Sequence, residues 1–167
     1  MNIILIGFMG SGKSSVGKAL AKRLNIEFLD TDELIEGVEG KKISRIFKEE
    51  GEDHFRALET DTLKTLKSYE GFVLSAGGGI VLRQENIDLL KEIGKVVLLT
   101  AEPDKIHERV GRETHRPLLN VSDPRAEIAR LLEKRRPSYQ AAADLTIDTT
   151  TLSVTEVAEK IIKELKL

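Results

Sequence analysis

A glycine-rich segment close to the first residue carries the clearest chemical signature. Its sequence, GFMGSGKS over residues 7–14, fits the pattern G-x-x-x-x-G-K-[S/T]. In such a loop, backbone N–H groups turn toward a β-phosphate, Lys13 adds a mobile positive charge, and the Ser14 hydroxyl can ligate Mg²⁺. A tight turn without a ligand is the alternative, but the strand pattern before the segment and the helix pattern after it favour nucleotide binding.

The loop by itself does not name a reaction, because GTPases, motor ATPases and non-catalytic sensors share it. The chain has no N-K-x-D or T-K-x-D stretch to recognise guanine, which disfavours a GTPase. Many such ATPases end a neighbouring strand with a metal-binding acidic residue. Here the corresponding segment, FVLS, ends at Ser75. Another residue must therefore help to hold the metal.

Two aspartates in the segment FLDTD are candidates for that role. Asp30 and Asp32 are two positions apart, so on extended backbone both carboxylates point to one side. They follow a predicted strand, at the edge of a parallel sheet where ligands bind. Asp30 could hold Mg²⁺ directly or through water, and Asp32 could receive the proton of an acceptor hydroxyl. Alternatively, one of the two caps a helix that begins near Glu33.

A glycine triplet follows the predicted third strand, at Gly77, Gly78 and Gly79. Three glycines could form a flexible turn, although a turn rarely needs all three. They are more consistent with a small substrate lying against bare backbone.

Several arginines stand near these motifs or beside a polar, proline-containing segment at 112–123. They are Arg56, Arg109, Arg112, Arg116, Arg135 and Arg136. Each alone could be a solvated surface residue, and Arg56 could form a surface ion pair with Glu59 three positions on. As a group they fit phosphoryl transfer to a small acid, because guanidinium groups neutralise developing charge and bind carboxylates in a fork. The histidines show no metal-ligand spacing.

Short apolar runs alternate with longer amphipathic segments, which predicts an α/β fold with a parallel sheet. Strands are predicted at 2–6, 27–30, 72–75, 95–100 and 145–148. Helices are predicted at 13–24, 43–50, 52–69, 83–93, 103–111, 124–136 and 154–165. The helix at 52–69 should bury one stripe against the sheet, made of Phe55, Leu58, Thr62, Leu66 and Tyr69.

Composition bounds the class of protein. The 167 residues are 40% hydrophobic and 32% charged, with a net charge of -2, which predicts one globular domain and gives no global attraction to nucleic acid or membranes. Cysteine is absent, which excludes disulfides and thiolate zinc sites. No signal or membrane-spanning pattern is visible, so a cytoplasmic location is expected. The segment at 112–123 is predicted to be a mobile lid.

Taken together, these motifs closely resemble those of the shikimate kinase family, in order and over almost the whole chain. The segments that carry the resemblance are GFMGSGKS, FLDTD, FR at Phe55, GGG, RPLL from Arg116 and KRRPSY from Lys134. The resemblance implies a three-layer P-loop fold with a central five-stranded parallel sheet and a lid, over a single domain at 1–167. It also implies Mg²⁺-dependent transfer of the γ-phosphoryl group of ATP to the 3-hydroxyl of shikimate, in the pathway to aromatic amino acids.

The same resemblance assigns roles to residues. The phosphates of ATP would be held by Gly10, Ser11, Gly12, Lys13, Ser14 and Ser15. Mg²⁺ would be held by Ser14 and Asp30. Shikimate would be bound by Asp32, Arg56, Gly77, Gly78, Gly79, Arg116 and Arg135. Lys13, Asp32 and Arg116 would be catalytic, with Arg116 on the lid, and Arg109 would stack on adenine.

One departure from the family pattern concerns the adenine pocket. After its last strand the family often has a basic residue and a proline, whereas this chain has the sequence TTTL at 149–152. Two other functions stay open at this point: another small-molecule kinase of the same fold, such as a gluconate or nucleotide kinase, and an ATP-binding regulatory module without chemistry. Asp32 and Arg116 disfavour the second, because nucleotide binding alone needs neither. We expect a monomer.

Overall fold

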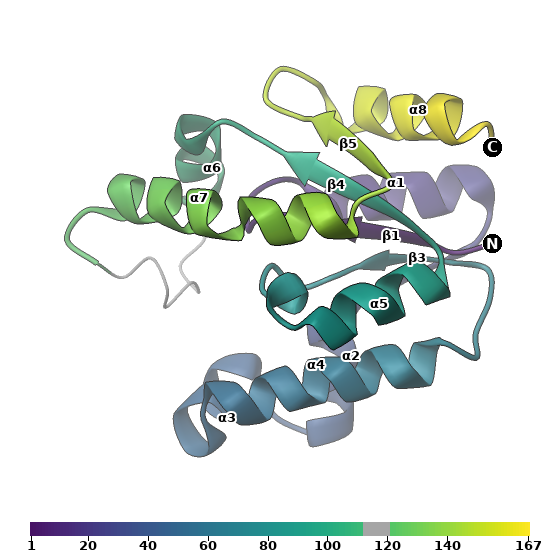
Figure 1. Cartoon of the computed structure of the whole chain (residues 1–167). Helices are drawn as coiled ribbons and strands as arrows, with labels where there is room; N and C mark the ends of the chain where they lie inside the picture. The colour runs from purple at the N-terminus through teal and green to yellow at the C-terminus, as the bar shows by residue number, and fades with distance from the viewer. Residues whose placement is uncertain (112–120) are drawn as a thin grey trace.

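The computed structural model describes residues 1–111 and 121–167, shown in Figure 1. Over these residues the strands form one five-stranded parallel sheet in the order β2-β3-β1-β4-β5. The strands are β1 (Ile3–Ile6), β2 (Glu27–Asp30), β3 (Phe72–Ser75), β4 (Lys95–Thr100) and β5 (Leu145–Asp148). Because all strands run the same way, their carboxyl ends share one edge of the sheet, and the P-loop and both aspartates lie there.

Helices cover both faces of the sheet and give the three-layer arrangement that was predicted (Figure 1). One core packs α1 (Lys13–Leu24) and α8 (Val154–Leu165) against the sheet through Val16, Leu20, Val157 and Ile161. The opposite core packs α4 (Glu52–Leu66), α5 (Gln84–Ile93) and α7 (Pro124–Ala142) against it. The sheet is apolar on both sides, as expected for parallel strands between helical layers.

The remaining elements lie around the carboxyl edge of the sheet. They are α2 (Thr31–Glu39), α3 (Ile43–Glu50), the short 3₁₀ helix η1 (Ile80–Leu82) and α6 (Pro103–Val110). A small core of Ile35, Ile46 and Phe55 holds α2, α3 and α4 together. Among the described residues, every helix is too short or too polar to cross a membrane.

Helix α2 was not predicted as an element, although the alternative role for the aspartates required a helix in that region. It begins at Thr31, directly after β2, with no intervening loop. Asp30 is therefore both the last residue of the strand and the N-cap of the helix. A strand and a helix with a shared boundary residue leave no loop in the sequence to mark the change.

Two other predictions about helices were wrong in part. Helix α7 does not end before Pro137 but continues through it to Ala142, because Arg135 and Tyr139 are buried on either side of the proline and hold the helix in place. In α4 the predicted stripe holds only in part: Phe55 and Leu66 are buried, whereas Tyr69 lies beyond the helix and is 57% exposed. The buried face also includes the polar residues Arg56 and Glu59, which the prediction left out.

Candidate active site

The P-loop connects β1 to α1 and turns its backbone toward the carboxyl edge of the sheet. Gly10 and Gly12 have φ of +76° and +99°, a backbone conformation that favours glycine. The N-cap of α1 has no side-chain hydrogen bond, and the first turn contains no acidic residue. The Lys13 ammonium donates to the carbonyl oxygens of Gly7 and Phe8 at 2.8 and 2.9 Å. Amides, helix dipole and ammonium together form an anion-binding site.

Three hard oxygen donors meet beside the P-loop. The Ser14 hydroxyl lies 3.3 Å from Asp30 Oδ2 and 3.3 Å from the Ser75 hydroxyl. The other Asp30 oxygen, Oδ1, accepts from the backbone N–H groups of Asp32 and Glu33 at 2.9 and 3.3 Å. The capping role considered for Asp30 is therefore confirmed. Its other oxygen faces Ser14, where the predicted metal role would place it, and that role stays a prediction. Clustered hydroxyl and carboxylate oxygens fit Mg²⁺, which prefers such ligands.

Asp32 reaches the site by a different route from the one predicted. It lies in the first turn of α2, not on extended backbone, so the reasoning from strand periodicity was wrong. The helix nevertheless directs Asp32 into the same cleft as Asp30 and Ser14. A Cβ atom at Gly77 would lie 3.3 Å from Asp32 Oδ1, so this carboxylate adjoins the glycine triplet.

Arg56 and Glu59 form a buried ion pair in α4, not the surface pair that the sequence allowed. Arg56 is 8% exposed and Glu59 is 0% exposed, and Arg56 Nη1 donates to Glu59 Oε1 at 2.6 Å. A Cβ atom at Gly79 would overlap the Arg56 guanidinium, so any larger residue would require the guanidinium to move. Arg56 Nε and Glu59 Oε2 have no hydrogen-bond partner among the described residues. Buried polar atoms of this kind indicate a place where a ligand or water binds.

Burial raises the pKa of the Glu59 carboxyl above its ordinary value, and the nearby Arg56 charge only partly offsets this. The Asp32 carboxylate adds to the rise and Arg135 opposes it. Four ionisable groups from three helices therefore influence one another around the glycine triplet.

Arg135 approaches the glycine triplet from α7. It is 6% exposed, its guanidinium carbon lies 5.6 Å from the centre of the Phe8 ring, and a Cβ atom at Gly78 would be 3.6 Å from its Nη1. One turn later, the Tyr139 hydroxyl donates to the Gly78 carbonyl at 2.6 Å. Burial raises the pKa of Tyr139, which therefore stays a neutral donor. Helix α7 thus supplies a cation to this site and also fixes its backbone.

The opposite end of the cleft is closed by Arg109 and Thr149. Arg109 Nη1 donates to the Gly10 carbonyl at 3.0 Å and to the Thr149 hydroxyl at 3.1 Å. The Thr149 side chain also contacts the carbonyl oxygens of Ser11 and Thr100 at 3.1 and 3.0 Å. The segment after β5, which departs from the family pattern, is therefore bonded directly to the P-loop.

One cleft of about 400 Å³ is lined by the P-loop, both aspartates, Ser75, Gly77, Gly78, Arg109 and Thr149. After the roles predicted from the sequence, we call the part formed by the P-loop, Arg109, Thr149 and Leu152 the nucleotide end. We call the part formed by Asp32, Gly77 and Gly78, with the adjoining Gly79, Arg56 and Arg135, the acceptor end. The structure thus brings together every predicted site residue that it describes, including Ser15 on the cleft wall. Arg116 and most of the predicted lid, residues 112–120, lie outside the described residues.

Several residues that shape the cleft were not predicted from the sequence as site residues. Ser75 was mentioned only because it stands where an acidic residue often ends the strand, and Tyr139 only as part of the KRRPSY motif. Thr149 was noted only as a departure from a family pattern, and Glu59 only as a surface partner. Only their positions in the sequence could have indicated a role. Ser75 and Thr149 lie at or directly after a strand end, and Glu59 and Tyr139 lie three or four residues after a candidate arginine.

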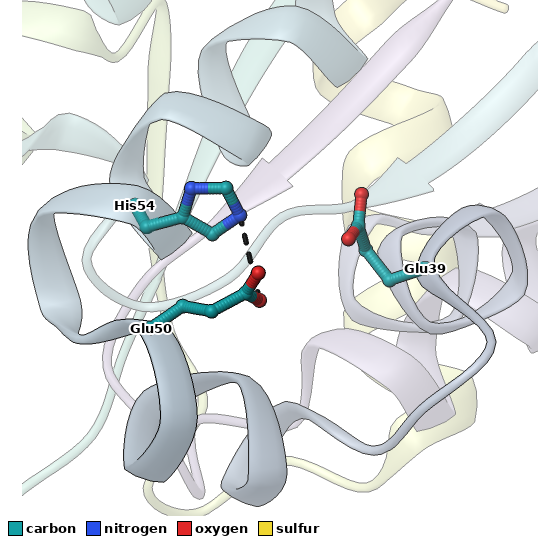
Figure 2. A group of neighbouring side chains, drawn as sticks. All are labelled: Glu39, Glu50 and His54. Carbon is teal, nitrogen blue, oxygen red and sulfur yellow. Dashed lines mark ion pairs between the residues drawn. The ribbon is translucent and has the colours of Figure 1, made fainter.

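A second group of potential ligands lies away from the cleft, where the ends of α2 and α3 meet the start of α4. Figure 2 shows Glu39, Glu50 and His54, whose ligand atoms all lie within 4.8 Å of one another. Spacing along the sequence did not reveal this group. His54 Nε2 lies 3.5 Å from Glu50 Oε2, and that oxygen also lies 3.1 Å from the Lys41 ammonium. We therefore interpret this group as partly exposed charge contacts between helices.

The fold and the P-loop cleft together define the class of the P-loop small-molecule kinases. Comparison with known proteins narrows this class. The family model described as shikimate kinase matches residues 9–166, so the chain belongs to the shikimate kinase family. It is 49% identical over 163 residues to a shikimate kinase of Thermodesulfovibrio yellowstonii, covering 98% of this chain and 94% of that relative.

Two further comparisons agree with this assignment. A shikimate kinase of Pelotomaculum thermopropionicum is 46% identical over 165 residues, covering 99% of this chain and 95% of the relative. Among solved structures, a shikimate kinase from Acinetobacter baumannii in complex with shikimate superposes with a TM-score of 0.95 at 40% identity, covering 99% of this chain and 92% of that chain.

Proposed function

We propose that this chain transfers the γ-phosphoryl group of ATP to the 3-hydroxyl of shikimate. The observation that carries the proposal is the acceptor end of the cleft, where Arg56 and Arg135 meet the glycine triplet beside Asp32. A small hydroxylated acid fits this set, because two guanidinium groups can grip its carboxylate and a carboxylate can accept from its hydroxyls. Membership of the shikimate kinase family names that acid as shikimate.

In the reaction, a bond forms between the acceptor oxygen and the γ-phosphorus as the bond to the β-phosphate bridging oxygen breaks. The acceptor's hydroxyl proton passes to Asp32, and ADP leaves with the bridging oxygen. Lys13 and the P-loop amides stabilise charge on the phosphates, so the protein contributes mainly positioning and electrostatics. Arg116, outside the described residues, is proposed to complete this charge stabilisation from the lid.

Magnesium is required by this family, and Ser14 and Asp30 are proposed to hold it, with Ser75 close by. When bound, the ion neutralises charge on the β- and γ-phosphates. Arg109 and the segment after β5 are proposed to enclose adenine, since they form the wall of the nucleotide end.

A coupled ADP assay tests the proposal directly. ATP and Mg²⁺ would be supplied with shikimate, gluconate, AMP or no acceptor. ADP formation should require both shikimate and Mg²⁺, and calorimetry should detect shikimate binding. Equal turnover with gluconate or AMP would favour another small-molecule kinase, and absence of both turnover and shikimate binding would favour a regulatory module.

Three further properties belong to the same proposal. The chain is proposed to act as one kinase domain over residues 1–167 with a lid near 112–123, to be monomeric, and to work in the cytoplasm. The single sheet and the cleft formed within one chain support the first two, because no second copy is needed to complete the described part of the site. Light scattering of the protein as it elutes from a size-exclusion column would test whether it is a monomer.

A further inference from the structure

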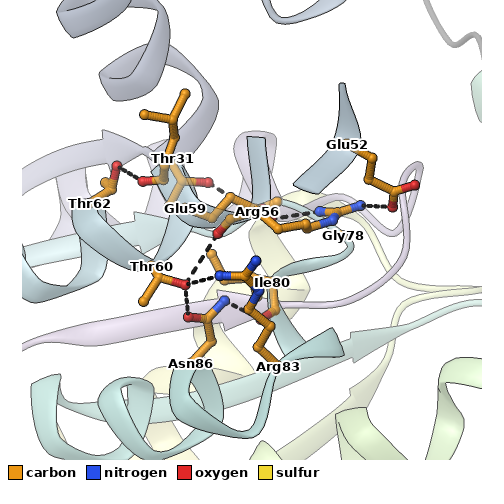
Figure 3. A network of polar contacts seen from close by, with 12 residues as sticks. Thr31, Glu52, Arg56, Glu59, Thr60, Thr62, Gly78, Ile80, Arg83 and Asn86 are labelled. Atoms are coloured by element: carbon orange, nitrogen blue, oxygen red, sulfur yellow. Dashed lines mark hydrogen bonds and ion pairs between the residues drawn. The ribbon is translucent and has the colours of Figure 1, made fainter. Parts of the chain in front are cut away.

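A buried polar network lies behind the acceptor end of the cleft, away from the substrate side. Figure 3 shows it joining α4 to α5 and to η1, the turn that follows the glycine triplet. Its centre is Asn86 in the first turn of α5, which is 0% exposed. Asn86 Oδ1 accepts from the Thr60 hydroxyl at 2.7 Å, and Asn86 Nδ2 donates to the Ile80 carbonyl at 2.9 Å.

The chemistry of the partners fixes the orientation of the Asn86 amide. The Ile80 carbonyl can only accept, so the amide nitrogen of Asn86 must face it. The amide oxygen must then face Thr60, whose single hydroxyl proton is donated to Asn86. The Thr60 hydroxyl also lies 3.2 Å from the Arg56 carbonyl and 3.5 Å from Arg83 Nη1. Both ends of the Asn86 amide are thus used, and neither a leucine nor an aspartate could replace it without losing a bond.

Asn86 joins α4 to η1, and the distance between these two segments sets the shape of the acceptor end. Thr60 lies one helical turn after Arg56, and Ile80 is the residue directly after Gly79. Gly79 and the Arg56 guanidinium are already in closest contact, because no Cβ atom fits between them. A small relative shift of α4 and η1 would therefore move the guanidinium away from the triplet or force it against the backbone.

We propose that Asn86 is a positioning residue for the acceptor end, acting through Thr60 and Ile80 to hold Arg56 at the correct distance from the glycine triplet. The inference rests on the proposed function, since it assumes that Arg56 binds the acceptor. A buried amide that is hydrogen-bonded at both ends favours one geometry, whereas an apolar contact of the same volume would tolerate several. The expected consequence is selective: acceptor binding depends on Asn86 and nucleotide binding does not.

The chain offers a matched control in Asn2, another buried asparagine with both amide ends bonded. Asn2 Nδ2 donates to the carbonyl oxygens of Tyr69 and Ile93 at 2.9 and 3.0 Å, and Oδ1 accepts from the Gly71 N–H at 2.8 Å. It precedes β1 and so lies at the opposite edge of the sheet from the cleft. Loss of its bonds should reduce stability without changing the acceptor end.

The experiment measures steady-state KM for shikimate and for ATP in Asn86→Leu, Thr60→Val, the double variant, Thr60→Ser and Asn2→Leu. Asn86→Leu and Thr60→Val should each raise the shikimate KM roughly fivefold to tenfold and leave the ATP KM within about twofold of native. The shikimate KM of the double variant should not exceed the higher of the two single-variant values, because both substitutions break the same connection between α4 and η1. Thr60→Ser retains the hydroxyl and should behave as native. Asn2→Leu should lower Tm and leave both KM values unchanged.

An unchanged shikimate KM in Thr60→Val, whose shape is conserved and whose folding is least at risk, would overturn the inference. Additive effects in the double variant, or a parallel rise of both KM values, would overturn it as well. These results are distinguishable from failure of the proposed function, in which the native protein itself would not phosphorylate shikimate.

Discussion

At the nucleotide end of the cleft the binding groups are mostly backbone amides from one continuous loop, whereas at the acceptor end they are side chains from three helices and one turn. The P-loop groups predicted to bind phosphate all come from residues 7–14 at the start of α1, although Arg109 and Thr149 also hydrogen-bond to the loop. The acceptor end needs Asp32 of α2, Arg56 of α4 and Arg135 of α7 to meet around the glycine triplet. The first end is therefore a local structure, and the second depends on how helices pack.

The two ends also differ in how charge is treated. Lys13 and the amides of the P-loop face a cleft where a polyanion is expected. Arg56 and Glu59 are instead held together in the interior, and burial opposes the charge of Glu59. A buried pair of this kind fixes geometry at an electrostatic cost. The acceptor end should consequently respond to small changes that the nucleotide end would tolerate.

The largest effect is expected from Asp32→Asn, which removes the proposed proton acceptor and keeps the size of the side chain. Turnover should fall on the order of 10²- to 10⁴-fold, and the KM for ATP should stay close to native. The neighbouring Glu33→Gln is the control, since Glu33 is exposed on the same turn of α2. Near-normal turnover in Asp32→Asn would remove its proposed role.

A smaller but selective effect is expected from Arg135→Lys. Lysine keeps the positive charge but loses the planar fork, so the KM for shikimate should rise about 10- to 100-fold. Arg136→Lys is the matched control, because Arg136 is the next residue and its side chain is 59% exposed. Similar KM values for the two variants would show that burial of Arg135 in the cleft has no special role in acceptor binding.

Thr149→Val tests whether the nucleotide end extends beyond the P-loop. The change keeps the shape of the side chain but removes the hydroxyl that contacts Arg109 and Ser11. The KM for ATP should rise about threefold to tenfold, with the shikimate KM unchanged. The exposed Thr151→Val should leave both values as they are. A rise in the shikimate KM alone would contradict the division of the cleft into two ends.

The smallest effect concerns the pH dependence of stability in Glu59→Gln. Because the folded protein raises the pKa of Glu59, its contribution to stability is full below its unfolded value and is lost as pH rises through the higher folded value. The free energy of unfolding of Glu59→Gln, relative to native, should therefore increase from about pH 4.5 upward. Denaturant unfolding at several pH values measures this difference. A difference that decreases with pH would mean that the pKa of Glu59 is lowered in the folded protein.

Much of the fold could be predicted because it depends on local patterns. Four of the five strands have the predicted bounds, and β1 differs by one residue. Each strand is a short run with apolar residues that is separated from its neighbours by helical patterns. Helix α2, which was not predicted, shares Asp30 with β2, so no loop in the sequence marks where the helix begins. The extension of α7 past Pro137 depends on burial of Tyr139, which a local rule about proline does not include.

The sequence by itself determined the P-loop, the family and the identity of the candidate residues, because each depends on residues that are neighbours in the chain or on a set of motifs in order. Only the tertiary structure decided that the Arg56 and Glu59 pair is buried, that Thr149 bonds to the P-loop, and that Asn86 joins α4 to the turn after the triplet. The physical reason is that the burial of a residue and the distance between two helices depend on how the whole chain packs. A short segment of sequence does not contain that information.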